Sequence, residues 1–338
     1  VPSNFSLIDF ASIPYRRLTA KAGLRSVKIV FWLSHLIFPH ARFLYRKSKE
    51  LIDYFRLQSG GNVAEFPYDG LVKLNLPPVS LSDVLWSKKT IPHFNLVQAS
   101  EHEPTLRVLV SELFNRGLLD STKSIVDIGC WLGDNALPWA FRLDDGGGQV
   151  FGIDPSEDNL HFVRQVANLN GLRNVVLFDA VCSDTAGVQV GTHDDISHAT
   201  LSTLLESAHV VRSTTTLDEL IPQNLISRIG LLHLDVEGME REVILGAKVL
   251  IKRSRPLVIF ERHLSDEESK SPVTALQSMG YDVFMINEVI AGNRPDCRNF
   301  LCFPRENQED YSLMADGIFP SAAFKAIEGS RLRAVTRP

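Results

Sequence analysis

Residues 125–133 read Ile-Val-Asp-Ile-Gly-Cys-Trp-Leu-Gly, an apolar run that leads directly into a glycine-rich turn. Asp127 stands just before the turn, and the run itself predicts a buried strand. A second apolar run, Val150–Ile153, ends in Asp154, twenty-seven residues after Asp127. A strand, a turn that lets backbone N–H groups face a ligand, and an acid at the tip of the next strand are typical of a nucleoside-binding α/β unit.

The middle of the chain alternates strand-like and helix-like segments, which predicts a parallel sheet with covering helices in an α/β, Rossmann-like fold. The predicted strands are 124–128, 150–153, 175–178, 229–234, 257–260 and 283–286, and the predicted helices are 105–119, 157–168 and 239–251. Residues 187–204 are poorly periodic and predict a loop or hairpin. Residues 322–327 predict a short helix.

The length of 338 residues allows a large domain with an appendage. We expect a mainly helical or irregular N-terminal extension over 1–100 and the α/β domain over 101–338. Helical patterns at 27–38 and 40–57 meet at Pro39. The first 58 residues hold ten Lys and Arg against three Asp and Glu, whereas the remainder holds 25 against 37, which together give the net charge of −5.

This basic segment either contacts an anionic partner or packs on the acidic remainder of the chain, and we favour packing. A membrane-surface role for residues 27–57 is the less favoured alternative. The longest apolar run, Ile29–Phe38, is too short to span a bilayer. We expect no nucleic-acid partner, and the sequence does not indicate an oligomeric state.

The four cysteines show no C-x-x-C spacing, which favours reduced thiols. We therefore expect a cytoplasmic protein. Because the first residue is Val, we leave open whether a native N-terminal segment precedes it.

Residues of the first turn are candidates for holding a nucleoside cofactor. Gly129 and Gly133 let the backbone approach the ligand, and Asp127 is placed to meet a cationic amino-acid end. Asn135 opens the following helix, whose N-terminus favours a carboxylate. Asp154 has a carboxylate that can accept from both ribose hydroxyls, although capping of the next helix is an alternative role.

Asp179 and Ala180 follow the third predicted strand and are candidates for contacting adenine, with a surface turn as the alternative. A second strand-to-turn string, Leu231-Leu-His-Leu-Asp-Val-Glu-Gly-Met-Glu, crowds Asp235, Glu237 and Glu240 into one turn. Like charges this close are costly unless they meet a cation, helix N–H groups or a ligand. Helix capping accounts for Glu240 better than for Asp235.

We take Asp235, Glu237 and His263 as the candidate general bases. His263 follows the fifth predicted strand at the same sheet edge, where an imidazole can accept a proton near neutral pH. No histidine spacing suggests a metal, and we predict none.

Taken together, these strings resemble the FkbM family of S-adenosylmethionine-dependent methyltransferases. The strings that carry the resemblance start at Val126 (VDIGCWLGDN), Gly152 (GIDP), Asn168 (NLNGL), Ala180 (AVCSD), Thr216 (TLDEL), Leu234 (LDVEGME), Gly246 (GA), Arg255 (RP) and Phe260 (FE). They occur in the family's order. Glu103, ahead of the first strand, resembles a Glu that the family often carries there, which makes it a further cofactor-binding candidate.

The resemblance implies a class I methyltransferase sheet, S-adenosyl-L-methionine as cofactor, and O-methylation of a hydroxyl on a sugar, glycan or secondary metabolite. The chain departs from the family where His233 replaces a usual Lys and where Asp154 replaces a usual Glu. Two alternatives remain at this stage. One is a non-catalytic scaffold that uses its basic N-terminal helices, and the weaker one is a nicotinamide dehydrogenase, which the absence of G-x-G-x-x-G disfavours.

Overall fold

The computed structural model describes residues 42–69, 71–87, 91–192, 201–202, 210–263, 271–286, 297–307 and 324–326. The chain divides into two compact units, one made of 1–63 with 76–94 and the other of 64–75 with 95–338. The helix expected at 27–38 lies outside the described residues. The domain boundary expected at residue 100 stays a prediction.

The first unit contains the helices α2 (Arg42–Ser59) and α3 (Leu81–Trp86). α2 confirms the helix expected at 40–57. Lys47 joins the two helices, because its Nζ lies 2.8 Å from Glu50 Oε2 and donates to the Val84 carbonyl at 2.7 Å. α4 (Pro92–Ala99) begins in this unit and ends in the other.

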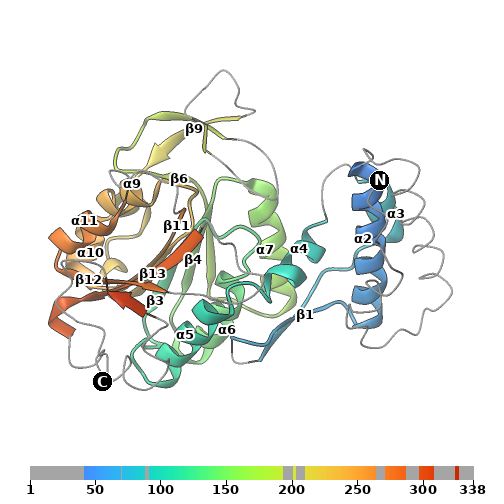
Figure 1. The fold of residues 1–338 in the computed structure, drawn as a ribbon, viewed down its shortest axis with the longest axis horizontal. Coiled ribbons are helices and arrows are strands. Elements are labelled where there is room, and N and C mark those ends of the chain that lie inside the picture. Colours follow the sequence, from blue (N-terminus) through green and yellow to red (C-terminus); the bar gives the residue numbers. More distant parts are fainter. Residues whose placement is uncertain are drawn as a thin grey trace, which may run out of the picture. The chain divides into compact units, whose positions relative to one another are not determined.

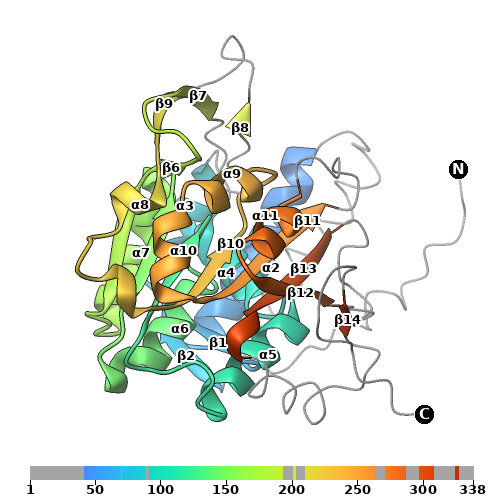
Figure 2. The same cartoon turned by 90° about the vertical axis from the view of Figure 1, so that its left-hand side faces the viewer.

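The second unit is built on an eight-stranded sheet with the order β14-β12-β13-β11-β10-β3-β4-β5 (Figures 1 and 2). The strands are β3 (Ser124–Ile128), β4 (Val150–Asp154), β5 (Val175–Asp179), β10 (Ile229–Leu234), β11 (Leu257–His263), β12 (Tyr281–Ile286), β13 (Cys297–Pro304) and β14 (Phe324–Ala326). Neighbouring strands from β5 to β11 run parallel, whereas β13 is antiparallel to both β11 and β12. All six predicted strands are confirmed in this sheet.

Two strands of the sheet differ from the sequence prediction. β14 is a strand where a short helix was expected at 322–327, so that prediction is wrong: residues 324–326 pair with β12 and stand at the end of the strand order. β13 was not predicted, because Arg298 and Asn299 interrupt its apolar pattern. Pairing with β11 and β12 along both of its edges makes it a strand despite those polar residues.

Helices cover both faces of the sheet (Figures 1 and 2). One face carries α5 (Pro104–Asn115), α6 (Ala136–Leu143) and α7 (Glu157–Leu169), and the other carries α8 (Leu217–Leu220), α9 (Glu240–Leu245), α10 (Lys248–Ser254) and α11 (Val273–Ser278). Short 3-10 turns lie at Asp144–Gly146, Ile226–Arg228 and Arg305–Asn307. On the α8–α11 face, a continuous core of buried aliphatic and aromatic side chains joins sheet and helices.

The helix expected at 239–251 is divided into α9 and α10 at Gly246. A Cβ at Gly246 would lie 2.0 Å from the Ser183 carbonyl oxygen, so the chain passes another backbone too closely for a side chain. Asp218 then caps α10, since its carboxylate accepts from the backbone N–H groups of Val249 and Leu250 at 2.9 and 2.8 Å. The break is therefore set by tertiary contacts.

A small second sheet has the order β6-β9-β7-β8. Its strands are β6 (Val181–Cys182), β7 (Gln189–Thr192), β8 (Leu201–Ser202) and β9 (Val210–Thr215). β7 and β8 form an antiparallel pair, which agrees with the hairpin alternative for 187–204. β6 begins two residues after β5 ends, so this sheet extends the molecule beyond the carboxyl end of β5 (Figure 2). The hairpin β1 (Val63–Phe66) and β2 (Val72–Asn75) forms a third sheet.

Candidate active site

Five parallel strands, β5, β4, β3, β10 and β11, end at one edge of the large sheet. Asp154 and Asp179 are direct neighbours across β4 and β5, and Asp127 lies opposite His233 across β3 and β10. Asp235 follows β10 directly, and its N–H donates to the Ile128 carbonyl at 2.9 Å. The fold thus places the sequence-predicted acids at the carboxyl edge, where open α/β sheets bind ligands.

The two glycines of the first turn are required by packing as well as by backbone conformation. Gly129 and Gly133 have φ values of 79° and 77°, in the left-handed region. A Cβ at Gly129 would lie 1.8 Å from the Asp235 carbonyl oxygen, and one at Gly133 would meet Leu137 at 2.9 Å and Val163 at 3.1 Å. The sequence interpretation, that these glycines admit a ligand, omitted this close contact between the β3 and β10 turns.

Asp154 holds the first turn against the start of α7. Its carboxylate accepts from the N–H of Trp131 at 2.9 Å, from the N–H of Ser156 at 2.8 Å and from Asn159 Nδ2 at 3.1 Å. Burial raises the pKa of Asp154 to about 6, although these hydrogen bonds act to lower it. A carboxylate has about four acceptor sites, so roughly one remains for a ribose hydroxyl. The N-cap of α7 is Ser156, not Asp154.

Asp127 and His233 form a buried pair beneath the first turn. His233 Nδ1 lies 2.7 Å from Asp127 Oδ1, and the side chains are 3% and 1% exposed. The edge of the Trp139 ring meets the imidazole at 5.3 Å between centroids and 88° between planes. Within the described part of the chain, Asp127 Oδ2 has no hydrogen-bond partner. Burial lowers the pKa of His233, but the bond to Asp127 and nearby carboxylates outweigh it and raise the pKa.

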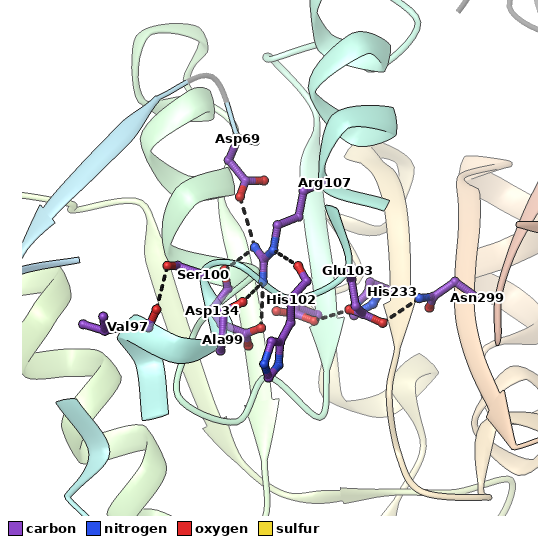
Figure 3. Close-up of polar contacts among 11 residues, drawn as sticks. Asp69, Val97, Ala99, Ser100, His102, Glu103, Arg107, Asp134, His233 and Asn299 are labelled. Carbon is purple, nitrogen blue, oxygen red and sulfur yellow. Dashed lines mark hydrogen bonds and ion pairs between the residues drawn. The ribbon is translucent and has the colours of Figure 1, made fainter. Parts of the chain in front are cut away.

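Glu103 lies beside this pair. It precedes α5 with a left-handed φ of 49°, and its Oε1 accepts from Asn299 Nδ2 at 2.6 Å. Figure 3 shows Glu103 between His233 and Asn299. The structure therefore brings Glu103, on a segment ahead of the first sheet strand, to the edge that Asp127 and Asp235 occupy.

Arg107 is the buried cation that organises this region, and the sequence analysis did not single it out. Its guanidinium is 1% exposed and pairs with Asp69 at 3.0 Å and with Asp134 at 2.9 Å. It also donates to the backbone carbonyls of Asp134, His102 and Ala99 (Figure 3). These bonds join the first turn to the segment that carries Glu103. The sequence signal that could have indicated a buried cation was the position of Arg107 among the apolar residues of the predicted helix 105–119.

A carboxyl group of the second turn, that of Asp235, interacts with the carboxyl group of Glu261 on the neighbouring strand β11. Burial raises the pKa of Asp235 well above its usual range, with further increases from the charges of Glu261, Glu103 and Glu237 and from a hydrogen bond with Glu261. The Asp235 residue as a whole keeps part of its surface exposed to solvent. A carboxyl group whose pKa is raised by burial and by neighbouring negative charge keeps its proton to higher pH, and this applies to Asp235. Glu261, on β11, belongs to the FE string of the family resemblance, and the sequence analysis predicted no catalytic role for it.

The other acids of this turn have separate roles. Glu240 is 4% exposed, and its Oε1 accepts from the N–H groups of Val236 at 3.2 Å and Gly238 at 3.1 Å. It lies in the first turn of α9, where acids are favourable, but its carboxylate binds N–H groups of the preceding turn and does not cap the helix. Glu237 is partly exposed and has a left-handed φ of 53°.

The remaining candidates are placed less centrally. β11 ends at His263, whose backbone pairs with Cys297, and whose side chain lies outside the described residues. Asp179 forms an ion pair with Arg212 of β9 at 2.5 Å, and Ala180 follows it, partly exposed. Asn135 makes no cap bond to α6, and its Oδ1 has no partner in the described part of the chain. The cofactor and catalytic roles of all these candidates stay predictions.

This edge fits a cationic nucleoside better than a metal ion. Among the described residues, no group of three or more His, Cys, Asp and Glu side chains is arranged to hold a metal. The carboxylates of Glu103 and Glu237 add to the negative charge around Asp235. The unpartnered Asp127 Oδ2 is a further buried acceptor beside them. A ligand with a positive charge would offset the negative charge around Asp235, and its hydrogen-bond donors could bind Asp127 Oδ2.

Comparison with known families identifies the domain. Residues 127–288 match the methyltransferase FkbM domain. This region is an FkbM methyltransferase domain. The assignment confirms the resemblance seen in the sequence and implies S-adenosyl-L-methionine as cofactor. No curated protein matches the sequence.

The chain that carries this domain is also similar to solved methyltransferase structures. An FkbM methyltransferase from Methylobacillus flagellatus aligns with a TM-score of 0.40 and 11% identity over 76% of this chain and 60% of that one. A precorrin-6y C5,15-methyltransferase from Geobacter metallireducens gives 0.35 and 14% over 58% and 88%. A SAM-dependent methyltransferase from Aquifex aeolicus gives 0.33 and 12% over 58% and 89%. This chain thus covers 60% of the Methylobacillus protein.

The membrane-surface role considered for residues 27–57 stays a prediction, because the described helices bear only on membrane spanning. None of the helices in the described ranges is both long enough and apolar enough to cross a bilayer. The free cysteines Cys130, Cys182, Cys297 and Cys302 are all buried.

Proposed function

We propose that this protein transfers the methyl group of S-adenosylmethionine to a hydroxyl group of a sugar, glycan or secondary metabolite. The observation that carries the proposal is the Asp235–Glu261 carboxyl pair beside the first turn. The Asp235 backbone lies against Gly129, so a base in this pair is adjacent to the place where the family's cofactor binds. The acceptor class comes from the family resemblance.

The residues contribute position and proton transfer. The bound cofactor supplies an already activated methyl group, so the protein needs only to align an oxygen with it and remove a proton. The raised pKa of Asp235 makes its carboxylate, once ionised, a stronger acceptor for the hydroxyl proton. Glu237 and His263 are the other candidate bases.

Cofactor binding is assigned to the first turn and its neighbours. Asp154 keeps an acceptor site for the ribose, while Asp127 and Glu103 attract the cationic amino-acid end. Asp179 and Ala180 border the expected adenine position at the end of β5. Arg107 fixes the turn but does not itself face the ligand in this assignment.

The test has a binding arm and a turnover arm. Calorimetry with S-adenosylhomocysteine should show binding that Asp154→Ala abolishes. The control variant Glu65→Gln, which removes the exposed ion pair with Lys73 between β1 and β2, should leave this binding unchanged. A methyl-release assay over glycans and polyphenols should then find an acceptor whose product mass rises by one methyl group.

Three outcomes separate the alternatives. Absence of binding by the wild-type protein would refute the cofactor assignment. Binding without turnover on any acceptor would favour the non-catalytic scaffold. Methyl transfer to nitrogen or carbon, located by fragmentation of the product, would keep the methyltransferase but overturn the hydroxyl acceptor.

A further inference from the structure

His233 stands where this family usually has Lys, and its imidazole ring is buried against a carboxylate. The ring is 3% exposed and is held from two sides, by Asp127 Oδ1 at 2.7 Å and by the edge of Trp139. Sheet register fixes the contact, since His233 lies directly opposite Asp127 on the neighbouring parallel strand. A lysine would stay charged throughout the physiological pH range, whereas an imidazole titrates within it.

The charged groups around His233 come from three elements. Asp127 lies on β3, Glu103 precedes α5, and Asp134 lies in the turn between β3 and α6. All three are acids and favour the imidazolium, and they outweigh the burial that opposes it. The helix α6 contributes only the neutral ring of Trp139. In the protein without ligand, His233 is therefore the cation that these acids stabilise.

Two of those acids are also the residues assigned to the cationic end of the cofactor. We propose that His233 releases its proton when the ammonium group of S-adenosylmethionine binds beside Asp127 and Glu103, so that cofactor affinity is linked to pH. This inference rests on the proposed function. His233 is then a positioning residue: its ring orients Asp127 in both protonation states, and its charge is exchanged for that of the ligand.

The sign of the effect follows from electrostatics. A second cation near the imidazolium disfavours the charged form, so binding lowers the pKa of His233 and the proton leaves to solvent. By reciprocity, raising the pH through the pKa of free His233 strengthens binding. One released proton corresponds to an affinity gain of at most about tenfold per pH unit. Above about pH 8 the ligand's own amine loses its charge and the gain ends.

The experiment counts protons on binding. S-adenosylhomocysteine, which carries the same amino-acid end and undergoes no turnover, is titrated calorimetrically at pH 6.5 in buffers of different ionisation enthalpy. The wild-type protein should release about 0.5–1 proton, since more than half of His233 is protonated below its pKa. His233→Gln keeps a donor for Asp127 but has no titratable ring. This variant should release about 0.5–1 proton fewer than the wild-type protein. His233→Lys should match Gln in proton count.

Asp154 also titrates near this pH, so the difference between wild type and His233→Gln is the quantity that decides. Equal proton counts in the two proteins would overturn the proposal. A readout that needs no variant to fold is the titration of the histidine ring ¹³C signals of the wild-type protein by NMR. One buried histidine should titrate at lower pH with S-adenosylhomocysteine bound, by about one unit or more, and unchanged pKa values for all histidines would overturn the proposal.

The two proposals fail separately. If S-adenosylhomocysteine does not bind, the cofactor assignment itself is wrong. If it binds with the same affinity from pH 6 to 8 and without proton release, the methyltransferase assignment stands and only the role of His233 is refuted.

Discussion

The turn after β3 and the turn after β10 have the same position in the sheet but differ in how their polar groups are satisfied. Around the β3 turn, buried groups hold the acids: Arg107 binds Asp134, His233 lies against Asp127 Oδ1, and Asp154 at the end of β4 accepts three hydrogen bonds. In the β10 turn, Asp235 meets another carboxyl group, and the charges that most affect it are all negative. The first turn is therefore fixed in position by paired groups, whereas the second carries negative charge that the described residues do not neutralise, as the proposed proton transfer requires.

The largest expected effect tests the β10 turn. The double variant Asp235→Asn with Glu261→Gln should lower kcat by about 10²–10⁴, the range for loss of a general base. Its affinity for S-adenosylhomocysteine should change only a few-fold, because the first turn is intact. Each single variant should lose less, because one carboxyl group of the pair remains. A double variant with wild-type kcat would place the base elsewhere, with Glu237 and His263 as the next candidates.

Arg107 tests the β3 turn. Arg107→Met removes the cation from between Asp69 and Asp134 and leaves both acids without their buried partner. The free energy of unfolding should fall by about 3–5 kcal/mol, as for other broken buried ion pairs. Arg116→Met, at the C-cap of α5, removes a partly exposed ion pair with Glu112 and should cost at most about 1 kcal/mol in the same denaturant titration. Equal losses would show that Arg107 does not organise the turn.

Asp154 gives a pH test of the same turn. Its pKa of about 6 lies above the value of 3.8 expected when unfolded, so the native state binds the extra proton between these values. Stability contributed by Asp154 should therefore be present below about pH 4 and fall by about 2–3 kcal/mol as the pH rises through 6. The difference between wild type and Asp154→Asn in urea unfolding from pH 4 to 7 measures it. Asp145→Asn, at an exposed position, is the matched control variant.

The smallest effect concerns the rim of the site. The ion pair between Arg212 and Asp179 is partly exposed, so Arg212→Ala should change the free energy of unfolding by only about 0.2–1 kcal/mol. If Asp179 contacts adenine, its release from Arg212 should also alter S-adenosylhomocysteine affinity, whereas Arg173→Ala on the exposed turn before β5 should not. A loss above 2 kcal/mol in thermal unfolding would show that the small sheet is part of the core.

Local sequence patterns predicted the elements whose cause is local. The strands β3 and β10 have apolar residues on both faces and confirm the predicted ranges, because burial inside a parallel sheet favours such runs. The pattern was insufficient where distant contacts decide the structure. Gly246 breaks a predicted helix because it meets the Ser183 backbone, and β14 is extended because it pairs with β12.

The sequence by itself determined the α/β fold, the FkbM family and the acids at the carboxyl edge, because strand runs, turn glycines and their order are local properties. Only the tertiary structure brought Arg107 to Asp134, His233 to Asp127 and Glu261 to Asp235. Each of these pairs joins residues on different elements. Their protonation and hydrogen bonding depend on burial and distance, which the order of residues does not contain.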